Sequence, residues 1–407
     1  MPGPLAGITV LDLSSTFLGP YGTVQLVDLG ADVILVEPPA GEITRSLGIV
    51  AEPGISSVFV AANRGKASCV LDLKGSAGRD ALRALVAHAD VLVHNMRPSA
   101  AKRLGIDADA LLEVNPRLIH CTANGFGSEG PYAGRPAYDD IIQAACGLAA
   151  LQGQHTGEPT YVASTVVDKT IALMLANAVL AALLHRERTG SGQALEVPMF
   201  EGMVAFLLVE QLGGASFVPA AGPVGYSRTA TPHRRPYRTS DGHIGVVVYT
   251  PGQWERFLTH VGRAHLLEDP RYSTAAARST NIDDLYAIIG EELANGTTAD
   301  WMADLARLEI PAVPVNTIED LLVDPHLEAV GMFPELAYAN GLTVRAARSP
   351  LRFSETPAEP PRPAPEMGAD TVRVLREAGL DEEAITSVLS ETRTHPAAPA
   401  YLKERSR

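Results

Sequence analysis

The sequence predicts an α/β protein with a doubly wound parallel sheet, followed by a smaller α+β domain. Short, continuously apolar runs alternate with helical patterns in the first half of the chain, which is typical of strands buried on both faces. The expected strands are 8–13, 31–37, 67–73, 90–94, 118–122 and 193–197. Ligands bind such sheets beyond the carboxyl ends of the strands. The loops expected to share this rim are 14–17, 37–39, 95–97 and 123–127.

The composition changes in the second half of the chain. A Gly-, Ala- and Pro-rich stretch indicates a linker, and a hairpin is expected around Asp241-Gly242. Amphipathic helical patterns follow at 254–261, 282–293 and 299–308, and a last helix at 370–378 precedes a charged tail. We expect a large domain formed by 1–212 plus 335–407, a small α+β domain at 226–330, and linkers at 213–225 and 331–334.

Charge and cysteine content limit the possible partners. The chain of 407 residues carries a net charge of −14, which argues against nucleic acid or an anionic membrane surface as the main partner. Its three cysteines, Cys69, Cys121 and Cys146, lie far apart and show no metal-ligand spacing. The start of the chain lacks the pattern of a signal peptide. We therefore expect a cytoplasmic protein with no metal site.

The longest apolar run, 170–184, predicts a central buried helix. With about 15 residues it is shorter than the ~20 needed to span a bilayer. Arg186, Arg188 and Gly190 suit its C-terminal end. Asp168 stands at its start, where a carboxylate complements the helix dipole. Taken alone, Asp168 is most simply explained as a capping residue.

Two further motifs could carry chemistry. Gly125 to Gly130 matches G-x-G-x-x-G, but Pro131 and Pro136 prevent the helix that a dinucleotide-binding turn requires. A basic block between residues 60 and 105 could form a phosphate-binding rim, or simply a solvated helix face. Arg97 and Arg103 are its best candidates for phosphate contacts because they follow the carboxyl end of a strand.

An ordered set of short motifs runs along nearly the whole chain. It includes 4–13, 19–20, 29–37, 63–66, 71–74, 103–105, 115–117, 125–127, 189–193 and 236–242. In this set the sequence resembles the family III (CaiB/BaiF) CoA-transferases, typified by formyl-CoA:oxalate CoA-transferase. The resemblance implies a Rossmann-like large domain and an interlocked homodimer. It also implies an enzyme of carboxylic acid metabolism that takes acyl-CoA and a small carboxylic acid as substrates and has no permanently bound cofactor.

The resemblance also implies roles for individual residues. Asp168 becomes the nucleophile, which forms an aspartyl acyl anhydride with the acyl group and then an aspartyl-CoA thioester. The helix start would keep its carboxylate ionised. Tyr138 and Asp139 would lie near the reacting thioester. The implied CoA-binding residues are Thr16, Phe17, Lys74, Asn95, Met96, Arg97, Arg103 and Leu104.

Departures from the family pattern affect the substrate. Phe17 replaces a glutamine and Pro38 an arginine of the formyl transferase, and 222–226 occupies the region of its glycine-rich lid without reproducing it. Oxalate is therefore not the expected acceptor, and Phe17 suggests a more apolar acyl pocket. One alternative is an α-methylacyl-CoA racemase, but Tyr138 stands where its base should be, and a phenol with a pKa of about 10 is a poor base. A non-catalytic acyl-CoA-binding protein is the third possibility.

Overall fold

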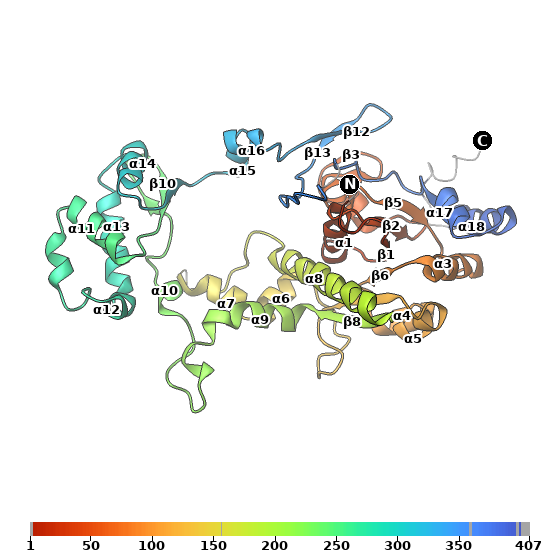
Figure 1. Cartoon of the computed structure of the whole chain (residues 1–407), viewed down its shortest axis with the longest axis horizontal. Helices are drawn as coiled ribbons and strands as arrows, with labels where there is room; N and C mark the ends of the chain where they lie inside the picture. The colour runs from red at the N-terminus through yellow and green to blue at the C-terminus, as the bar shows by residue number, and fades with distance from the viewer. Residues whose placement is uncertain (1–2, 156, 358–359, 396–398, 400–407) are drawn as a thin grey trace. The chain divides into compact units, whose positions relative to one another are not determined.

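The computed structural model describes residues 3–155, 157–357, 360–395 and 399 (Figure 1). These residues form two compact units. The first contains the described residues of 1–147, 161–205 and 326–407, and the second those of 148–160 and 206–325. The domain and linker boundaries expected from composition stay a prediction.

A six-stranded sheet forms the centre of the first unit. Its strands pair in the order β5-β2-β1-β6-β7-β8, and all the pairs are parallel. Their bounds are Thr9–Asp12 (β1), Asp32–Glu37 (β2), Ala67–Val70 (β5), Val91–His94 (β6), Ile119–Asn124 (β7) and Gln193–Pro198 (β8). The predicted α/β fold with a parallel sheet is confirmed. The strand order changes direction between β1 and β6, so the first loop of the chain lies at the switch point where ligands bind.

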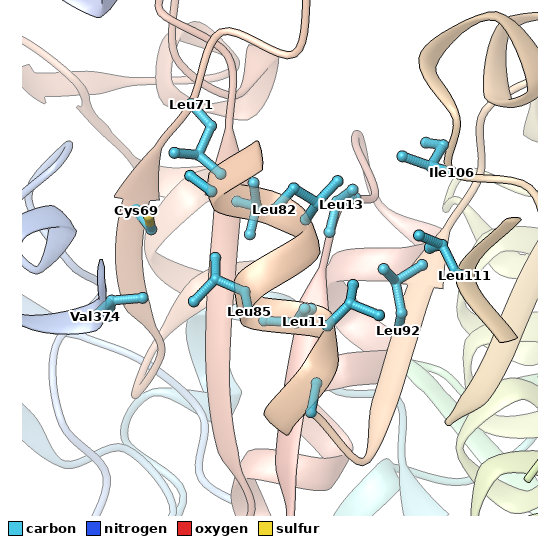
Figure 2. Packing of buried hydrophobic residues seen from close by; sticks show 14 of the residues in the cluster. Leu11, Leu13, Cys69, Leu71, Leu82, Leu85, Leu92, Ile106, Leu111 and Val374 are labelled. Carbon is cyan, nitrogen blue, oxygen red and sulfur yellow. The ribbon is translucent and has the colours of Figure 1, made fainter. Parts of the chain in front are cut away.

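Amphipathic helices cover this sheet and bury its leucine-rich face. Figure 2 shows Leu82 and Leu85 of α3 packed toward Leu11 and Leu92 of the strands. The helices of this unit are α1 (Leu18–Asp28), α2 (Ser57–Asn63), α3 (Ser76–His88), α4 (Pro98–Leu104), α5 (Ala108–Val114), α6 (Asp139–Ala145), α8 (Val166–Thr189), α17 (Thr371–Glu377) and α18 (Glu382–Thr394). Small hairpins add β3 (Val50–Glu52), β4 (Ile55–Ser56), β12 (Glu335–Ala337) and β13 (Thr343–Arg345).

The C-terminal part of this unit corrects one expectation. A charged tail was predicted after residue 378, but α18 is a helix that packs on α3. Its Ile385 and Val388 join the buried cluster beneath α3. Three or four residues separate its buried positions, so the helix presents a narrow apolar face while charged side chains cover the rest.

Helix α8 packs along α1 (Figure 1), and Gly22 permits the close approach. A Cβ at Gly22 would lie 3.2 Å from the carbonyl oxygen of Ala172. The expectation of a central buried helix holds for the side that packs on α1, whereas Leu173 and Leu184 are each 53% exposed. By length and composition, α8 is the one helix among the described residues that could cross a membrane. Its packing on α1 is that of a helix inside a protein core.

The second unit contains a three-stranded antiparallel sheet in the order β11-β10-β9. Its strands are β9 (Tyr237–Arg238), β10 (His243–Val246) and β11 (Ala312–Pro314). The predicted hairpin is confirmed by the antiparallel pairing of β9 and β10. Trp254, Phe257 and Ile289 lie in the core between this sheet and its helices. The helices are α7 (Leu148–Gln152), α10 (Ser227–Ala230), α11 (Pro251–His260), α12 (Ala275–Thr280), α13 (Ile282–Leu293), α14 (Thr298–Arg307) and α15 (Ile318–Leu321). Helices α9 (Met199–Gln211) and α16 (Pro325–Ala329) each run across a boundary between the two groups of residues.

Candidate functional site

A cavity of about 1090 Å³ opens at the carboxyl ends of the parallel strands. Its wall is built from loops that follow β1, β2, β5, β6 and β7, and from the first turn of α8. The wall residues from these loops include Ser14–Thr16, Glu37–Ile43, Leu71–Lys74, Asn95–Ser99 and Ala123–Phe126. Pockets of about 300–1,000 Å³ hold drug-sized ligands, so this cavity has room for a larger molecule.

The loop after β1 is fixed by three side chains from three different parts of the chain. The N–H groups of three successive residues each donate to a side-chain oxygen. The pairs are Ser14 with Asp12 Oδ1 at 2.9 Å, Ser15 with Asn95 Oδ1 at 3.1 Å, and Thr16 with Glu42 Oε1 at 2.9 Å. Thr16 has a φ of 66°, a left-handed conformation that costs energy for a β-branched residue. These bonds hold the loop in that shape at the edge of the cavity.

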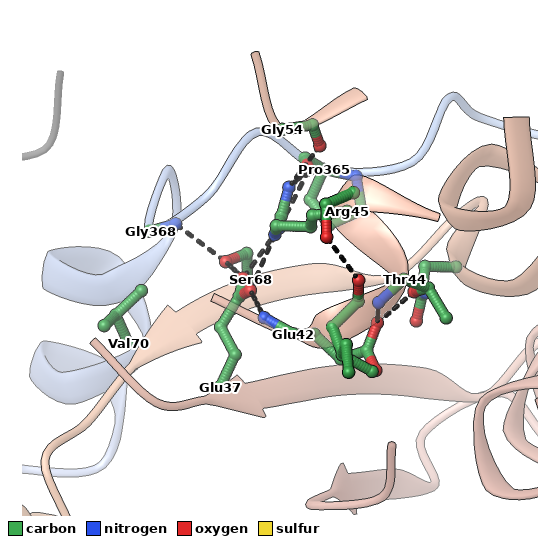
Figure 3. A network of polar contacts seen from close by, with 12 residues as sticks. Glu37, Glu42, Thr44, Arg45, Gly54, Ser68, Val70, Pro365 and Gly368 are labelled. Atoms are coloured by element: carbon green, nitrogen blue, oxygen red, sulfur yellow. Dashed lines mark hydrogen bonds and ion pairs between the residues drawn. The ribbon is translucent and has the colours of Figure 1, made fainter. Parts of the chain in front are cut away.

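Buried ion pairs anchor the residues that fix this loop. Figure 3 shows Glu37, which lies at the end of β2, bound through both carboxylate oxygens to Arg45 at 2.7 Å. Glu37 also accepts the N–H of Glu42 at 3.0 Å. Burial raises the pKa of Glu42. Such networks become rigid when every member is satisfied, so the position of Glu42 is set by the fold.

A second buried pair lies below the same loop. Lys66 Nζ is 2.8 Å from Asp12 Oδ2, and neither side chain is exposed to solvent. The ammonium also donates to the carbonyl of Pro20 at 3.0 Å and to Asn63 Oδ1 at 2.8 Å. Burial lowers the pKa of Lys66, and the charge of Asp12 opposes this change. The pair therefore fixes the carboxylate that holds Ser14.

Asp168 lies in the first turn of α8 and lines the cavity. Its own N–H donates to Asp139 Oδ1 at 2.9 Å, so the carboxylate of Asp139 caps α8 from another helix. The second oxygen of Asp139 accepts Gln143 Nε2 at 2.6 Å. Gln143 is fully buried and accepts the N–H of Val162 at 2.9 Å. Asp139 therefore uses both of its oxygens to hold the start of α8.

The ionisation of Asp168 differs from the expectation. Burial, followed by the negative charges of Asp139 and Asp140, raises the pKa of Asp168 from its ordinary 3.8 to about 7. The sequence argument considered only the helix dipole, which favours the charged form. Desolvation and like charges oppose the dipole and prevail here. At neutral pH the carboxyl group of Asp168 is therefore poised between its protonated and ionised forms.

The other predicted site residues divide into two groups. Thr16, Lys74, Asn95, Met96, Arg97, Leu104 and Tyr138 line the same cavity as Asp168. Among the described residues, Phe17, Arg103 and Asp139 lie outside its wall. Phe17 precedes the first turn of α1, and Arg103 lines a smaller cavity of about 310 Å³ with Arg79, Arg83 and Lys102. Tyr138 is 70% exposed, and its side chain is open to solvent.

Sequence reasoning missed three residues at this site: Glu42, Gln143 and Arg135. Gln143 stands four residues after Asp139 on α6, a spacing at which helical side chains meet, so a weak signal existed. Nothing in the sequence connects Glu42 with Thr16, because their contact depends on the packing of two loops. Arg135 lines the cavity from the loop that precedes α6. No group of three or more metal-ligating side chains occurs in the described parts of the chain.

Comparisons with known proteins agree on one family. The sequence pattern of CoA-transferase family III matches residues 5–371. A succinate–glutarate CoA-transferase of Agrobacterium fabrum is 32% identical over 396 residues, which cover 94% of this chain and 98% of the relative. A probable fatty acyl-CoA transferase, Rv3272 of Mycobacterium tuberculosis, is 32% identical over 377 residues, which cover 90% and 95%.

A solved structure agrees with the sequence relatives. The crystal structure of a CaiB/BaiF family protein from Brucella suis superposes with a TM-score of 0.78 and 32% identity. The match covers 93% of this chain and all of that one. The family match, the sequence relatives and the solved structure therefore indicate the same family over nearly the whole length of the sequence. The chain belongs to CoA-transferase family III.

Proposed function

We propose that this CoA-transferase moves CoA from an acyl-CoA thioester to a carboxylic acid, with Asp168 as the nucleophile. The carboxylate of Asp168 attacks the thioester carbonyl, and the CoA thiolate leaves, which gives a mixed aspartyl acyl anhydride. The thiolate then attacks the aspartyl carbonyl, which releases the donor acid and forms aspartyl-CoA. The acceptor acid reverses both steps: its carboxylate displaces the thiolate to form a new anhydride, and the thiolate then takes the acceptor acyl group and frees Asp168.

One observation carries this proposal: the carboxyl group of Asp168 lines the large cavity from the first turn of α8, where burial and two neighbouring acids raise its pKa to about 7. A carboxylate of raised pKa is a stronger nucleophile than an ordinary one, and half of it is ionised near neutrality. The same group must also leave readily from an anhydride. The raised pKa balances these two demands at the pH of the cell.

We infer that CoA lies along the loops after β5 and β6. Lys74 and Arg97 are exposed cations of the cavity wall and suit phosphate groups. Asn95 already bonds both backbone groups of Ser15, so it fixes this part of the wall rather than offering its amide to a ligand. Thr16, Met96 and Leu104 supply further surface. The exposed hydroxyl of Tyr138 can donate to the oxygen of the reacting thioester.

Trapping the intermediate tests the nucleophile. The protein is incubated with acyl-CoA and then with hydroxylamine or borohydride, and mass spectrometry locates the adduct. We expect modification at Asp168 and loss of transfer in Asp168→Ala. The matched control is Asp109→Ala, which removes an exposed aspartate from the first turn of α5 and should leave the rate unchanged. Full transfer by Asp168→Ala would refute the mechanism.

The assembly and location of the protein are also proposals. We infer a homodimer, as the family resemblance implies, and exposed apolar residues such as Leu173 and Leu184 of α8 support it. Light scattering after gel filtration measures the mass. We infer a cytoplasmic location because Cys69 and Cys121 are free, buried thiols. Burial raises the pKa of both thiols to about 12, so they are not reactive groups of the site.

A further inference from the structure

We propose that Arg135 binds the distal carboxylate of a dicarboxylic acyl group, so that the enzyme prefers dicarboxylic over monocarboxylic acids. The inference rests on the proposed function, because it assigns the substrate class of the same site. Relatives of both classes exist, since several are named for the dicarboxylic acids succinate, glutarate, mesaconate or oxalate and one is named for fatty acyl groups. Succinate and glutarate carry a second negative charge that a fatty acid lacks.

Arg135 shares a cavity with the proposed nucleophile and a short stretch of chain with the residue that caps its helix. Arg135 lines the same cavity as Asp168 and stands four residues before Asp139, which contacts the N–H of Asp168. Four residues span at most about 14 Å even when fully extended. The loop also turns back onto β7, because a Cβ at Gly125 would lie 2.3 Å from the Cβ of Ala137. A short acyl group attached at Asp168 therefore has a cation on the neighbouring loop.

An aromatic platform holds the side chain of Arg135. Its guanidinium carbon lies 4.2 Å from the centre of the Tyr132 ring. Tyr132 packs edge-on against Phe126 at 5.5 Å and against Phe200 at 6.3 Å. Phe126 is buried and lines the cavity. Stacking restrains the guanidinium through its face and leaves the N–H edge available.

That edge is unused within the protein. Among the described residues, none makes an ion pair or a side-chain hydrogen bond with the guanidinium of Arg135. By contrast, both guanidinium-bearing residues beside β2, Arg45 and Arg64, are bound to carboxylates. A planar guanidinium with two parallel N–H groups matches a carboxylate in bidentate geometry. A restrained, unpaired arginine in the wall is therefore suited to a substrate carboxylate.

The other cations of the wall are placed differently. Lys74 follows β5, which is four strands away from β7 in the sheet order. At about 4.8 Å per strand, this separation is roughly 19 Å, which suits the distant phosphates of CoA. Arg97 follows β6 and is one strand from β7. Of Lys74, Arg97 and Arg135, the last is closest in sequence to Asp139, which contacts Asp168. We therefore assign Arg135, and not the other two cations, to the acyl group.

Length-matched acceptors test this inference. Transfer from one fixed acyl-CoA donor is measured with succinate against butyrate, and with glutarate against valerate. We expect the wild-type enzyme to prefer the dicarboxylic acid in each pair. Arg135→Gln should lower kcat/KM for the dicarboxylic acids by about 10- to 100-fold, as expected for the loss of a charged hydrogen bond. It should change the monocarboxylic acids by less than about twofold. Arg135→Lys should recover part of the loss.

The outcomes separate the two proposals. An equal loss for both acids of a pair would place Arg135 on CoA and overturn the inference. So would a wild-type enzyme that transfers CoA only to monocarboxylic acids, and that result would leave the role of Asp168 intact. No transfer with any donor or acceptor would overturn the proposed function as well. Arg97→Gln is the comparison variant, and it should affect both members of each pair alike.

Discussion

Replacing Asp139 by asparagine tests how the protein sets the reactivity of Asp168. The substitution removes one of the two charges that raise the pKa of Asp168 and keeps an oxygen for the N–H of Asp168. The pKa rises by about three pH units in all, and burial is the largest cause. Asp139 therefore accounts for less than half of the rise. We expect Asp139→Asn to lower the pKa by about one unit, or about 1.4 kcal/mol.

The assay is the pH dependence of kcat/KM between pH 5 and 9, which reports the groups of the free enzyme. In the wild-type enzyme the rate should rise with pH through about 7, because Asp168 must be ionised to act as the proposed nucleophile. In Asp139→Asn this limb moves to about pH 6, where the ionised fraction of Asp168 grows about fivefold. A limb that stays in place or moves upward would refute the role of the Asp139 charge.

A second variant separates charge from geometry. In Asp139→Asn, the new amide N–H₂ faces the donor Nε2 of Gln143, which leaves two donors opposed. Gln143 cannot simply turn, because its oxygen accepts the N–H of Val162. The double variant Asp139→Asn/Gln143→Glu restores a donor–acceptor pair. This double variant should have a higher maximal rate than Asp139→Asn alone. Asp139→Ala, which also removes the cap of α8, should have a low maximal rate.

The remaining predictions concern stability. Because the folded pKa of Asp168 exceeds its unfolded value, the folded state binds its proton more tightly, and stability falls as pH rises from about 4 to 7. Asp168→Asn should raise the free energy of unfolding in urea by about 2–4 kcal/mol more at pH 8 than at pH 4; equal changes at both pH values would contradict this. Lys66→Met leaves the buried carboxylate of Asp12 unpaired and should cost about 3–5 kcal/mol. Asp12→Leu/Lys66→Met should recover part of it, and a single-variant loss below about 1 kcal/mol would contradict the burial argument.

The fold could be predicted because its strands are buried on both faces. Short apolar runs marked strands such as β1, β2 and β6, whereas the edge strand β8 contains Gln193 and Glu196 and is only partly buried. The predicted strand ends were wrong where a buried residue does not pair with a neighbouring strand. Leu71 is buried, and the strand was expected to continue through Leu73, but β5 ends at Val70. Helix α18 was missed because its narrow apolar face is hidden among charged residues.

The candidate site was less predictable because its key contacts join distant parts of the chain. Its place at a helix start alone indicated a capping role for Asp168, and only the family resemblance implied that it is the nucleophile. The resemblance placed Asp139 near the reacting thioester, but not its contact with the N–H of Asp168, because the two residues are 29 positions apart and meet through the packing of α6 on α8. The argument from the helix dipole used only the residues of α8, whereas the burial that raises the pKa of Asp168 depends on the tertiary structure. For that reason sequence reasoning found the carboxylate and gave the wrong direction for its pKa.

The three occupied N–H groups of Ser14, Ser15 and Thr16 have a consequence for what this fold can accept. In many doubly wound proteins, the first turn after β1 offers bare amides to a pyrophosphate. Here those amides donate hydrogen bonds to the side chains of Asp12, Asn95 and Glu42 instead. Two of these acceptors are acidic, so an incoming phosphate would meet competition and repulsion rather than a cradle. The loop that binds phosphate in many such folds is therefore bonded internally here, and our proposal assigns the phosphate contacts to side-chain cations elsewhere on the rim.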